Sequence, residues 1–279
     1  MKNVLRTLVC DGQVSLTVAD TTEIVKESIQ LHKLSVSSAE TLGRALSAMT
    51  FMSACLKGER GEISLSVKSD GLGGDIGVSG NRALKLRGYI HNQKVTEGAD
   101  ACWGKEGALT IIRDDGYSRP FVGACAFPTV GGLDGAFEEY FRISEQLPTR
   151  IATCVQMQGD ECIFAGVVAL QPLPFADQAA LTAVEDCSIY DLLSSVQKQG
   201  IENAAKSYFT VDESVYELRE AVYKCNCSRE YLLGVLASLG ERQMRQIIKE
   251  DGAVKVHCHY CSRDYEFTDK DADTLFHQG

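Results

Sequence analysis

Apolar and polar residues alternate in many short stretches of the first 170 residues, which is the pattern of half-buried β-strands. Residues 3–19 predict a β-hairpin in which Asp11-Gly12 forms a type I′ turn. Further strands are expected at residues 62–68, 75–79, 83–90, 108–113, 119–127, 150–156 and 161–170. Strands therefore dominate this part of the chain.

Helical periodicity interrupts the strands at a few places. It appears at residues 22–33, then from Ser37 through Leu56, where Ser37 and Glu40 are spaced as a capping box. A third amphipathic stretch covers residues 134–147. Because the helices are grouped and do not alternate with strands, we predict an α+β fold with a largely antiparallel sheet and packed helices.

The pattern changes after Gln171-Pro172-Leu173-Pro174, where two prolines stop regular structure. Residues 175–222 carry only helical signals, broken at Gly200, with a second helical pattern at 214–223. The apolar faces are modest, so these helices are stable only if they pack on something. We predict a β-rich core domain at residues 1–174 and a helical linker at 175–224.

The last part of the chain, residues 225–279, predicts a small separate domain. Helices are expected from Ser228 through Leu239, at 241–249, and after Thr268 and Asp271, with a short strand pair between the last two. About 55 residues give a small apolar core, and domains of this size commonly need a metal to fold.

Four of the eleven cysteines lie in this domain as two tight pairs, Cys225-x-Cys227 and Cys258-x-x-Cys261. Each pair supplies two thiolates from one turn, so the four can bind one zinc ion tetrahedrally. The single-residue gap of the first pair is shorter than the gap in most zinc sites. Each pair is also short enough to close as a local disulfide. The sulfurs can therefore hold a metal when reduced or form disulfides when oxidised.

Net charge, the lengths of the apolar runs and the cysteine count exclude some classes of protein. The net charge of −10 argues against a general nucleic-acid binder. No apolar run suggests a membrane span, and no signal peptide is recognised. Eleven cysteines without a signal indicate a reducing compartment, so we expect a cytoplasmic protein. We expect the other seven to be buried small hydrophobes: Cys10, Cys55, Cys102, Cys125, Cys154, Cys162 and Cys187.

The cysteine motifs resemble a known family. The run Cys225-Asn226-Cys227-Ser228-Arg229-Glu230 and the later Cys258-His259-Tyr260-Cys261 are similar to the zinc redox switch of heat-shock protein 33, a redox-regulated holdase chaperone. Tyr140-Phe141 with Ser144-Glu145-Gln146-Leu147-Pro148-Thr149 resembles a segment of that family's core. Arg87-Gly88-Tyr89 and Ile112-Arg113-Asp114 match weaker blocks. The resemblance covers nearly the whole chain.

The resemblance implies a mechanism. One zinc per chain is held by Cys225, Cys227, Cys258 and Cys261 in a reduced, inactive form. Oxidation forms the disulfides Cys225–Cys227 and Cys258–Cys261, releases zinc and unfolds the switch and the linker. The exposed surface then binds unfolding proteins without ATP, usually as a homodimer, and no catalytic residue is needed. Lys224 and Arg229 flank the first pair and are expected to offset its negative charge.

Other functions compete with this interpretation. The domain could be a structural zinc site that never switches, or a zinc ribbon that binds nucleic acid or a protein partner. From Cys225 onward we count seven Lys or Arg against nine Asp or Glu, which argues against nucleic acid. A thiol oxidoreductase would place its Cys-x-x-Cys in a βαβ unit, and a zinc hydrolase would need an open coordination position. His257 or His259 could also replace one thiolate ligand.

Overall fold

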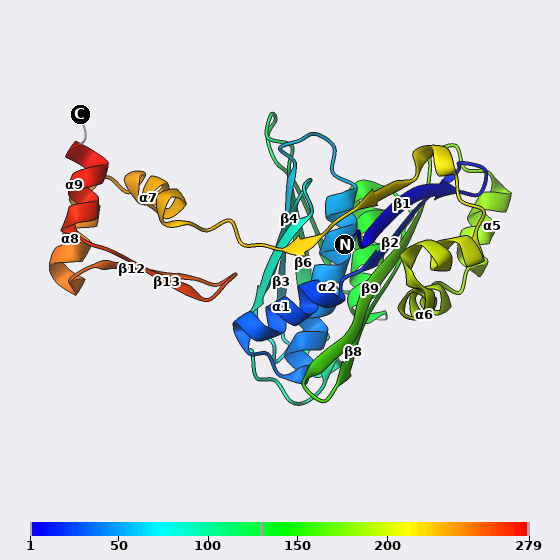
Figure 1. Cartoon of the computed structure of the whole chain (residues 1–279), viewed down its shortest axis with the longest axis horizontal. Helices are drawn as coiled ribbons and strands as arrows, with labels where there is room; N and C mark the ends of the chain where they lie inside the picture. Colours follow the sequence, from blue (N-terminus) through cyan, green and yellow to red (C-terminus); the bar gives the residue numbers. More distant parts are fainter. Residues whose placement is uncertain (1, 129–130, 278–279) are drawn as a thin grey trace. The chain divides into compact units, whose positions relative to one another are not determined.

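The computed structural model describes residues 2–128 and 131–277. Its contacts divide the chain into two compact units, one ending at Lys224 and one beginning at Cys225. Each unit combines helices with antiparallel strand pairs, so the predicted α+β class with largely antiparallel sheets is confirmed. Figure 1 shows the elements along the chain.

The first sheet of the larger unit has five strands in the order β10-β1-β2-β9-β8, all antiparallel. The predicted hairpin is confirmed: the Gln13 N–H donates to the Cys10 carbonyl at 3.1 Å, and both Asp11 and Gly12 have positive φ. The strand bounds are Val4–Val9 (β1), Val14–Asp20 (β2), Arg150–Gln158 (β8), Glu161–Pro172 (β9) and Glu217–Arg219 (β10).

The second sheet has six strands in the order β11-β5-β4-β3-β6-β7. Every pair is antiparallel except β11 with β5, which is parallel. The strand bounds are Glu62–Ser69 (β3), Ile76–Asn81 (β4), Lys85–Ile90 (β5), Gly107–Asp114 (β6), Phe121–Ala126 (β7) and Val222–Tyr223 (β11). All the strands expected between residues 62 and 127 are therefore present, with small shifts at their ends.

Helix α2 (Val36–Ala54) contacts strands of both sheets (Figure 1) and is buried along nearly its whole length. Its many Ala, Ser and Gly residues let both sheets approach closely. The capping box predicted at Ser37 is wrong, because the N-cap is Ser35 and Ser37 lies inside the helix. The Ser37 hydroxyl instead accepts a hydrogen bond from the Gly98 N–H at 3.0 Å.

Three shorter helices contact α2. Helix α1 (Thr22–His32) is close to its predicted range. The stretch expected as one helix at 134–147 is divided into α4 (Gly132–Tyr140) and a π-helical turn, η1 (Phe141–Glu145). Helix α3 (Ala99–Trp103) was not predicted, because five residues are too few to show periodicity.

Helices α5 (Gln178–Asp186) and α6 (Ile189–Tyr208) belong to the predicted linker, and both pack on the first sheet. Leu192, Leu193 and Val196 of α6 are buried against Val18 and Phe164 of the sheet in one apolar cluster. Gly200 interrupts α6 with φ +81°, as the predicted break requires. The narrow apolar faces of α5 and α6 are therefore buried against the first sheet.

The helix predicted at 214–223 is wrong. A single 3₁₀ turn, η2 (Glu213–Val215), is followed by the strands β10 and β11. These residues pair with the outer strands β1 and β5, whose edges would otherwise have unpaired backbone groups. Pairing with a distant strand has overridden the local helical pattern, and a sequence window cannot show such pairing.

The smaller unit follows the predicted order of elements. Ser228 caps α7 (Arg229–Ala237) by accepting from the Tyr231 N–H, and Gly240 precedes α8 (Glu241–Asp251). Strands β12 (Val254–Cys258) and β13 (Arg263–Phe267) form a hairpin, and α9 (Asp269–His277) follows it. The fully buried apolar core is small and consists of Leu236, Met244, Ile248, Val254, Phe267 and Ala272.

Candidate metal centre

The four predicted cysteines come from two short segments of the smaller unit. Cys225 and Cys227 lie in the loop before α7, while Cys258 ends β12 and Cys261 lies in the turn that leads to β13. That turn is tight, because the Ser262 N–H donates to the Cys258 carbonyl at 2.8 Å and Ser262 has φ +53°. The turn brings Cys258 and Cys261 to the same end of the hairpin.

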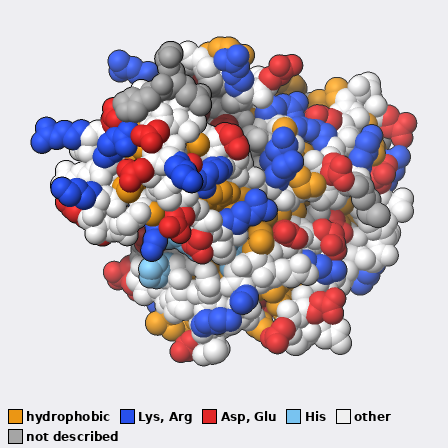
Figure 2. Space-filling view, turned by 60° about the vertical axis from the view of Figure 1, so that its left-hand side comes forward, with side chains coloured by type: hydrophobic (Ala, Val, Ile, Leu, Met, Phe, Trp, Pro, Cys, Tyr) orange, Lys and Arg blue, Asp and Glu red, His pale blue; other side chains and the backbone are white. Residues whose placement is uncertain are grey.

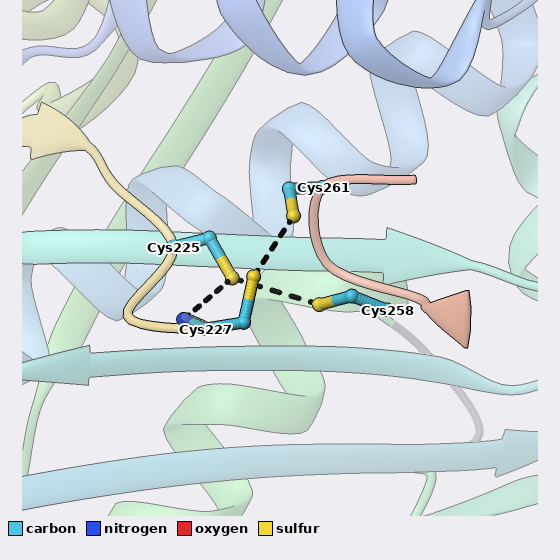
Figure 3. Close-up of side chains that lie close together, drawn as sticks. All are labelled: Cys225, Cys227, Cys258 and Cys261. Atoms are coloured by element: carbon cyan, nitrogen blue, oxygen red, sulfur yellow. Dashed lines mark hydrogen bonds between the residues drawn. The ribbon is translucent and has the colours of Figure 1, made fainter. Parts of the chain in front are cut away.

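The structure brings all four sulfurs together, and each lies within 4.8 Å of every other. Figure 3 shows the side chains of Cys225, Cys227, Cys258 and Cys261 pointing toward a common centre. Four thiolates around tetrahedral zinc, with Zn–S bonds of ~2.3 Å, would lie about 3.8 Å apart. The donor set and its spacing therefore fit zinc. No other group of His, Cys, Asp and Glu side chains in residues 2–128 and 131–277 converges in this way.

Two sulfur–sulfur contacts join the different pairs. The Sγ atoms of Cys225 and Cys258 are 3.6 Å apart, and those of Cys227 and Cys261 are 3.2 Å apart. All four sulfurs are within reach of one another, so proximity in the folded unit does not select a disulfide pairing.

Hydrogen bonds favour a thiolate at Cys227. Burial raises the pKa of its thiol, but the Tyr265 hydroxyl at 3.2 Å from Sγ and the neighbouring thiols lower it, to about 7. Burial instead raises the pKa of Cys225 to about 11. Tyr265 was not among the predicted site residues. Tyr265 lies opposite Val256 in the β12–β13 hairpin, which places it beside the cysteines. The only sequence signal for this position was an aromatic residue soon after the second cysteine pair.

Arg229, which was expected to offset the charge of the first cysteine pair, makes its contacts with other groups of the smaller unit. Its guanidinium pairs with Asp271 at 2.6 Å, donates to the Glu266 carbonyl at 2.9 Å, and lies over the Phe267 ring. The arginine therefore links the start of α7 to β13 and α9, and its charge is already balanced by an aspartate.

The two histidines near Cys258 lie outside the group of converging side chains. Nδ1 of His257 is 2.7 Å from the Asp264 carboxylate, and the His257 ring meets the His259 ring edge-on at 5.5 Å. The converging group consists of the four cysteines alone. The arrangement therefore gives no support to a histidine ligand.

The other seven cysteines lie in the larger unit, and none is a fully exposed thiol. Cys102, Cys125 and Cys162 are buried, as expected for small hydrophobes, while Cys10, Cys55, Cys154 and Cys187 are half-buried beside apolar clusters. Burial is the main cause that raises the pKa of all seven thiols, which keeps them protonated and poorly reactive.

Comparisons with known proteins agree over nearly the whole chain. The family model described as "Hsp33 protein" matches residues 2–268. Proteins named "33 kDa chaperonin" from Bacillus cereus and Bacillus anthracis are each 33% identical over 290 residues, covering 99% of this chain and 99% of the relative. The crystal structure of a 33 kDa chaperonin (Heat shock protein 33 homolog) from Thermotoga maritima superposes with a TM-score of 0.82. It covers 98% of this chain and 97% of its own at 24% identity, and so supports the fold. On the family match and the full-length relatives, this chain belongs to the Hsp33 family of chaperones.

Proposed function

We propose that this protein is a redox-regulated, ATP-independent holdase. The reduced form binds one zinc ion through Cys225, Cys227, Cys258 and Cys261 and does not capture clients. Oxidation of the four cysteines to two disulfides releases the metal and exposes a surface that holds unfolding proteins. The observation that carries this proposal is the convergence of four oxidisable sulfurs in a unit with a small apolar core.

The metal would hold the smaller unit together at one end. Its ligands come from the loop before α7 and from the β12–β13 turn, so zinc would tie two segments that are far apart in sequence. Structural zinc binding is worth about 10–16 kcal/mol in small domains, whereas a core of this size supplies only about 3–5 kcal/mol. Loss of the metal is therefore expected to unfold residues 225–279.

The oxidation requires an external two-electron oxidant for each disulfide. With peroxide, two thiols and one H₂O₂ give one disulfide and two waters; with hypochlorous acid, the products are one disulfide, chloride, a proton and water. The first thiol attacked becomes a sulfenic acid, and a second thiol displaces its oxygen as water. Disulfide formation would remove the thiolates of Cys225, Cys227, Cys258 and Cys261 that would hold the zinc ion, so the metal would no longer be retained.

We propose that the disulfides are Cys225–Cys227 and Cys258–Cys261. The alternative partners, Cys225 with Cys258 and Cys227 with Cys261, are 33 and 34 residues apart in sequence. Once the unit loosens, bringing such distant residues together costs about 2 kcal/mol more than closing a local pair. Local closure is therefore favoured in the unfolding unit.

The pairing can be assigned by tryptic digestion of the oxidised protein without reduction. Cleavage after Lys224, Arg229, Lys255 and Arg263 releases residues 225–229 and 256–263, each with one cysteine pair. Local disulfides give two separate peptides, each lighter by two hydrogens. Disulfides between the pairs give one linked peptide, and that result would contradict the proposed pairing.

Several properties of the partners follow from the same proposal. Unfolding proteins are the clients, the oxidised form is a homodimer, and the protein acts in the cytoplasm.

No helix in the described part of the chain is both long and apolar enough to span a membrane. Cationic and anionic side chains are interspersed on the face seen in Figure 2, and the net charge is −10, which supports our proposal that nucleic acid is not a partner.

The decisive experiment follows zinc and client on one sample. The reduced, zinc-loaded protein is treated with hypochlorite, a chromophoric chelator reports zinc, and light scattering follows an aggregating client. We expect about one zinc per chain to leave as aggregation is suppressed, and thiol reductant with zinc to reverse both. Zinc that stays bound, or leaves without protecting the client, would indicate a structural site that does not switch.

Cysteine variants make the same experiment specific. Cys227→Ser and Cys258→Ser should bind zinc more weakly, since each removes one thiolate of four. Cys10→Ser is the matched control, because Cys10 lies half-buried in the larger unit. Unchanged zinc content in either switch variant would contradict the proposed ligand set.

A further inference from the structure

One short segment covers an edge of both sheets in the larger unit. Within residues 217–224, β10 is the outermost strand of the first sheet and β11 is the outermost strand of the second. β10 pairs antiparallel with β1, and β11 pairs parallel with β5. We call Glu217–Lys224 the strap.

Backbone hydrogen bonds hold the strap at both edges. The Asn3 N–H donates to the Arg219 carbonyl at 3.0 Å on the first sheet. On the second sheet the Val222 N–H donates to the Leu84 carbonyl at 3.0 Å and the Lys224 N–H to the Leu86 carbonyl at 2.7 Å. These are the groups that any extended chain could satisfy at a strand edge.

Apolar side chains of the strap fill positions on both sides. Leu218 packs on the cluster between the first sheet and α6. Ala221 is buried in the other main cluster, and Tyr223 packs against it with its hydroxyl 2.9 Å from the Gly88 carbonyl. The edges of β1 and β5 therefore accept an extended segment that carries spaced apolar side chains.

The strand pairings of the strap are short, and some polar groups in and around it lack partners, although the Asn3 side chain accepts from the Ala221 N–H at 2.7 Å and donates to the Ala221 carbonyl at 3.1 Å. Only three residues pair with β1 and two with β5. Glu217 lies 3.5 Å from Arg219 and 3.7 Å from Arg82, yet one buried nitrogen of each arginine, and Nε of Arg6, has no hydrogen-bond partner among the described residues. Buried donors without partners destabilise the docked state. The strap also ends directly before Cys225.

We propose that the edges of β1 and β5, once the strap leaves them, bind an extended segment of an unfolding client as an added strand. This inference rests on the proposed function, in which loss of zinc unfolds the chain around Cys225. Strand addition uses main-chain hydrogen bonds that every polypeptide offers, so it accepts clients of many sequences. Folded proteins offer such groups only at the short and protected edges of their sheets, so they are bound far more weakly than unfolded chains.

A peptide with the strap sequence tests the proposal. Fluorescent residues 215–224 (VYELREAVYK) contain no cysteine and need no variant of the protein. We expect the peptide to bind the oxidised full-length protein, seen as a rise in anisotropy, and to bind the reduced, zinc-loaded form at least about tenfold more weakly, because the strap then occupies the site. Excess peptide should also reduce capture of a client diluted from guanidinium.

N-methylated peptides separate backbone pairing from side-chain adhesion. Methylation of the Val222 nitrogen removes the donor to Leu84 and should weaken binding at least about fivefold. Methylation of the Tyr223 nitrogen is the control, since alternation along a strand directs that N–H away from β5. Equal loss from both peptides, equal binding to both redox forms, or no binding at all would overturn the proposal.

The outcomes also separate this inference from the proposed function. Zinc release and client capture are measured without peptide, and their failure rejects the redox holdase. Successful capture that excess bound peptide does not reduce rejects strand addition while the holdase function stands.

Discussion

Tyr265 shows how one residue outside the ligand set acts on the proposed metal centre. Its hydroxyl lies 3.2 Å from Sγ of Cys227 and 3.5 Å from the Cys227 carbonyl. Groups that hydrogen-bond to metal ligands fix their orientation, and their loss commonly weakens metal binding about 10–100-fold. Tyr265 is therefore a positioning residue for Cys227.

We expect Tyr265→Phe to bind zinc at least about tenfold more weakly, because Cys227 loses a hydrogen bond while the ring still packs. Competition with a chromophoric chelator measures this affinity. Tyr231→Phe is the control in the same unit, since Tyr231 is 56% exposed on α7. Equal affinities of the two variants would contradict the role of Tyr265.

A second buried polar group joins α6 to the core. The carboxylate of Asp134 is 2% exposed, pairs with Arg44 at 3.1 Å, and accepts from the Thr153 N–H and from the Tyr190 hydroxyl at 3.0 Å. Burial and the nearby carboxylate raise the pKa of Tyr190 to about 12, so its hydroxyl stays protonated and donates.

Two substitutions should show how much each of these contacts contributes to the free energy of unfolding. Asp134→Ala leaves Arg44 without its partner in a largely buried place and should reduce the free energy of unfolding by about 3–5 kcal/mol. Tyr190→Phe removes only the bond from α6 and should cost about 1 kcal/mol. Urea denaturation of the reduced protein measures both. Similar losses from the two variants would show that the carboxylate is not the centre of the network.

At the scale of elements, Gly200 and Gly234 both lie in helices, but only Gly200 has a backbone conformation that requires glycine. Gly200 breaks α6 with φ +81° and ψ 168°, a conformation that other residues strongly disfavour. Gly234 lies inside α7, and a Cβ at this position would meet nothing within 4 Å. The first glycine is needed by the backbone, whereas the second only weakens its helix.

We therefore expect Gly200→Ala to destabilise the protein by about 1–3 kcal/mol and Gly234→Ala to stabilise the smaller unit by about 0.5–1 kcal/mol. Hydrogen exchange resolved by peptide should show faster exchange in α6 for the first variant and slower exchange in α7 for the second. A stabilised α7 should also delay zinc release at a given oxidant dose. Changes of the same sign in both helices would contradict this assignment.

The same scale shows what the sequence could and could not predict. The alternating strands, α1, α2 and the order of elements after Cys225 follow from local periodicity, and they were predicted. The strap was mistaken for a helix because its strands are defined by partners far away in the chain. Cysteine spacing identified the converging group, whereas Tyr265 depends on the register of a hairpin, which the spacing does not contain.

At the scale of the whole molecule, each unit has its own apolar core. We expect a chelator under reducing conditions to unfold residues 225–279 and to release the strap, while the other strands of the larger unit stay folded. Hydrogen exchange should then be fast in α7, α8 and α9 and remain slow in β3 and β9. Comparable loss of protection in β3 would show that the larger unit also depends on the metal.

The first sheet has a consequence for how the chain folds as it is synthesised. β1 and β2 leave the ribosome well before β9 and β10, yet β2 pairs with β9 at Glu161–Pro172 and β1 pairs with β10 at Glu217–Arg219. The β1–β2 hairpin therefore keeps its apolar residues exposed until most of the chain has emerged. A nascent chain of this chaperone is itself prone to aggregation for most of its translation, and it resembles the unfolding proteins that the finished molecule is proposed to hold.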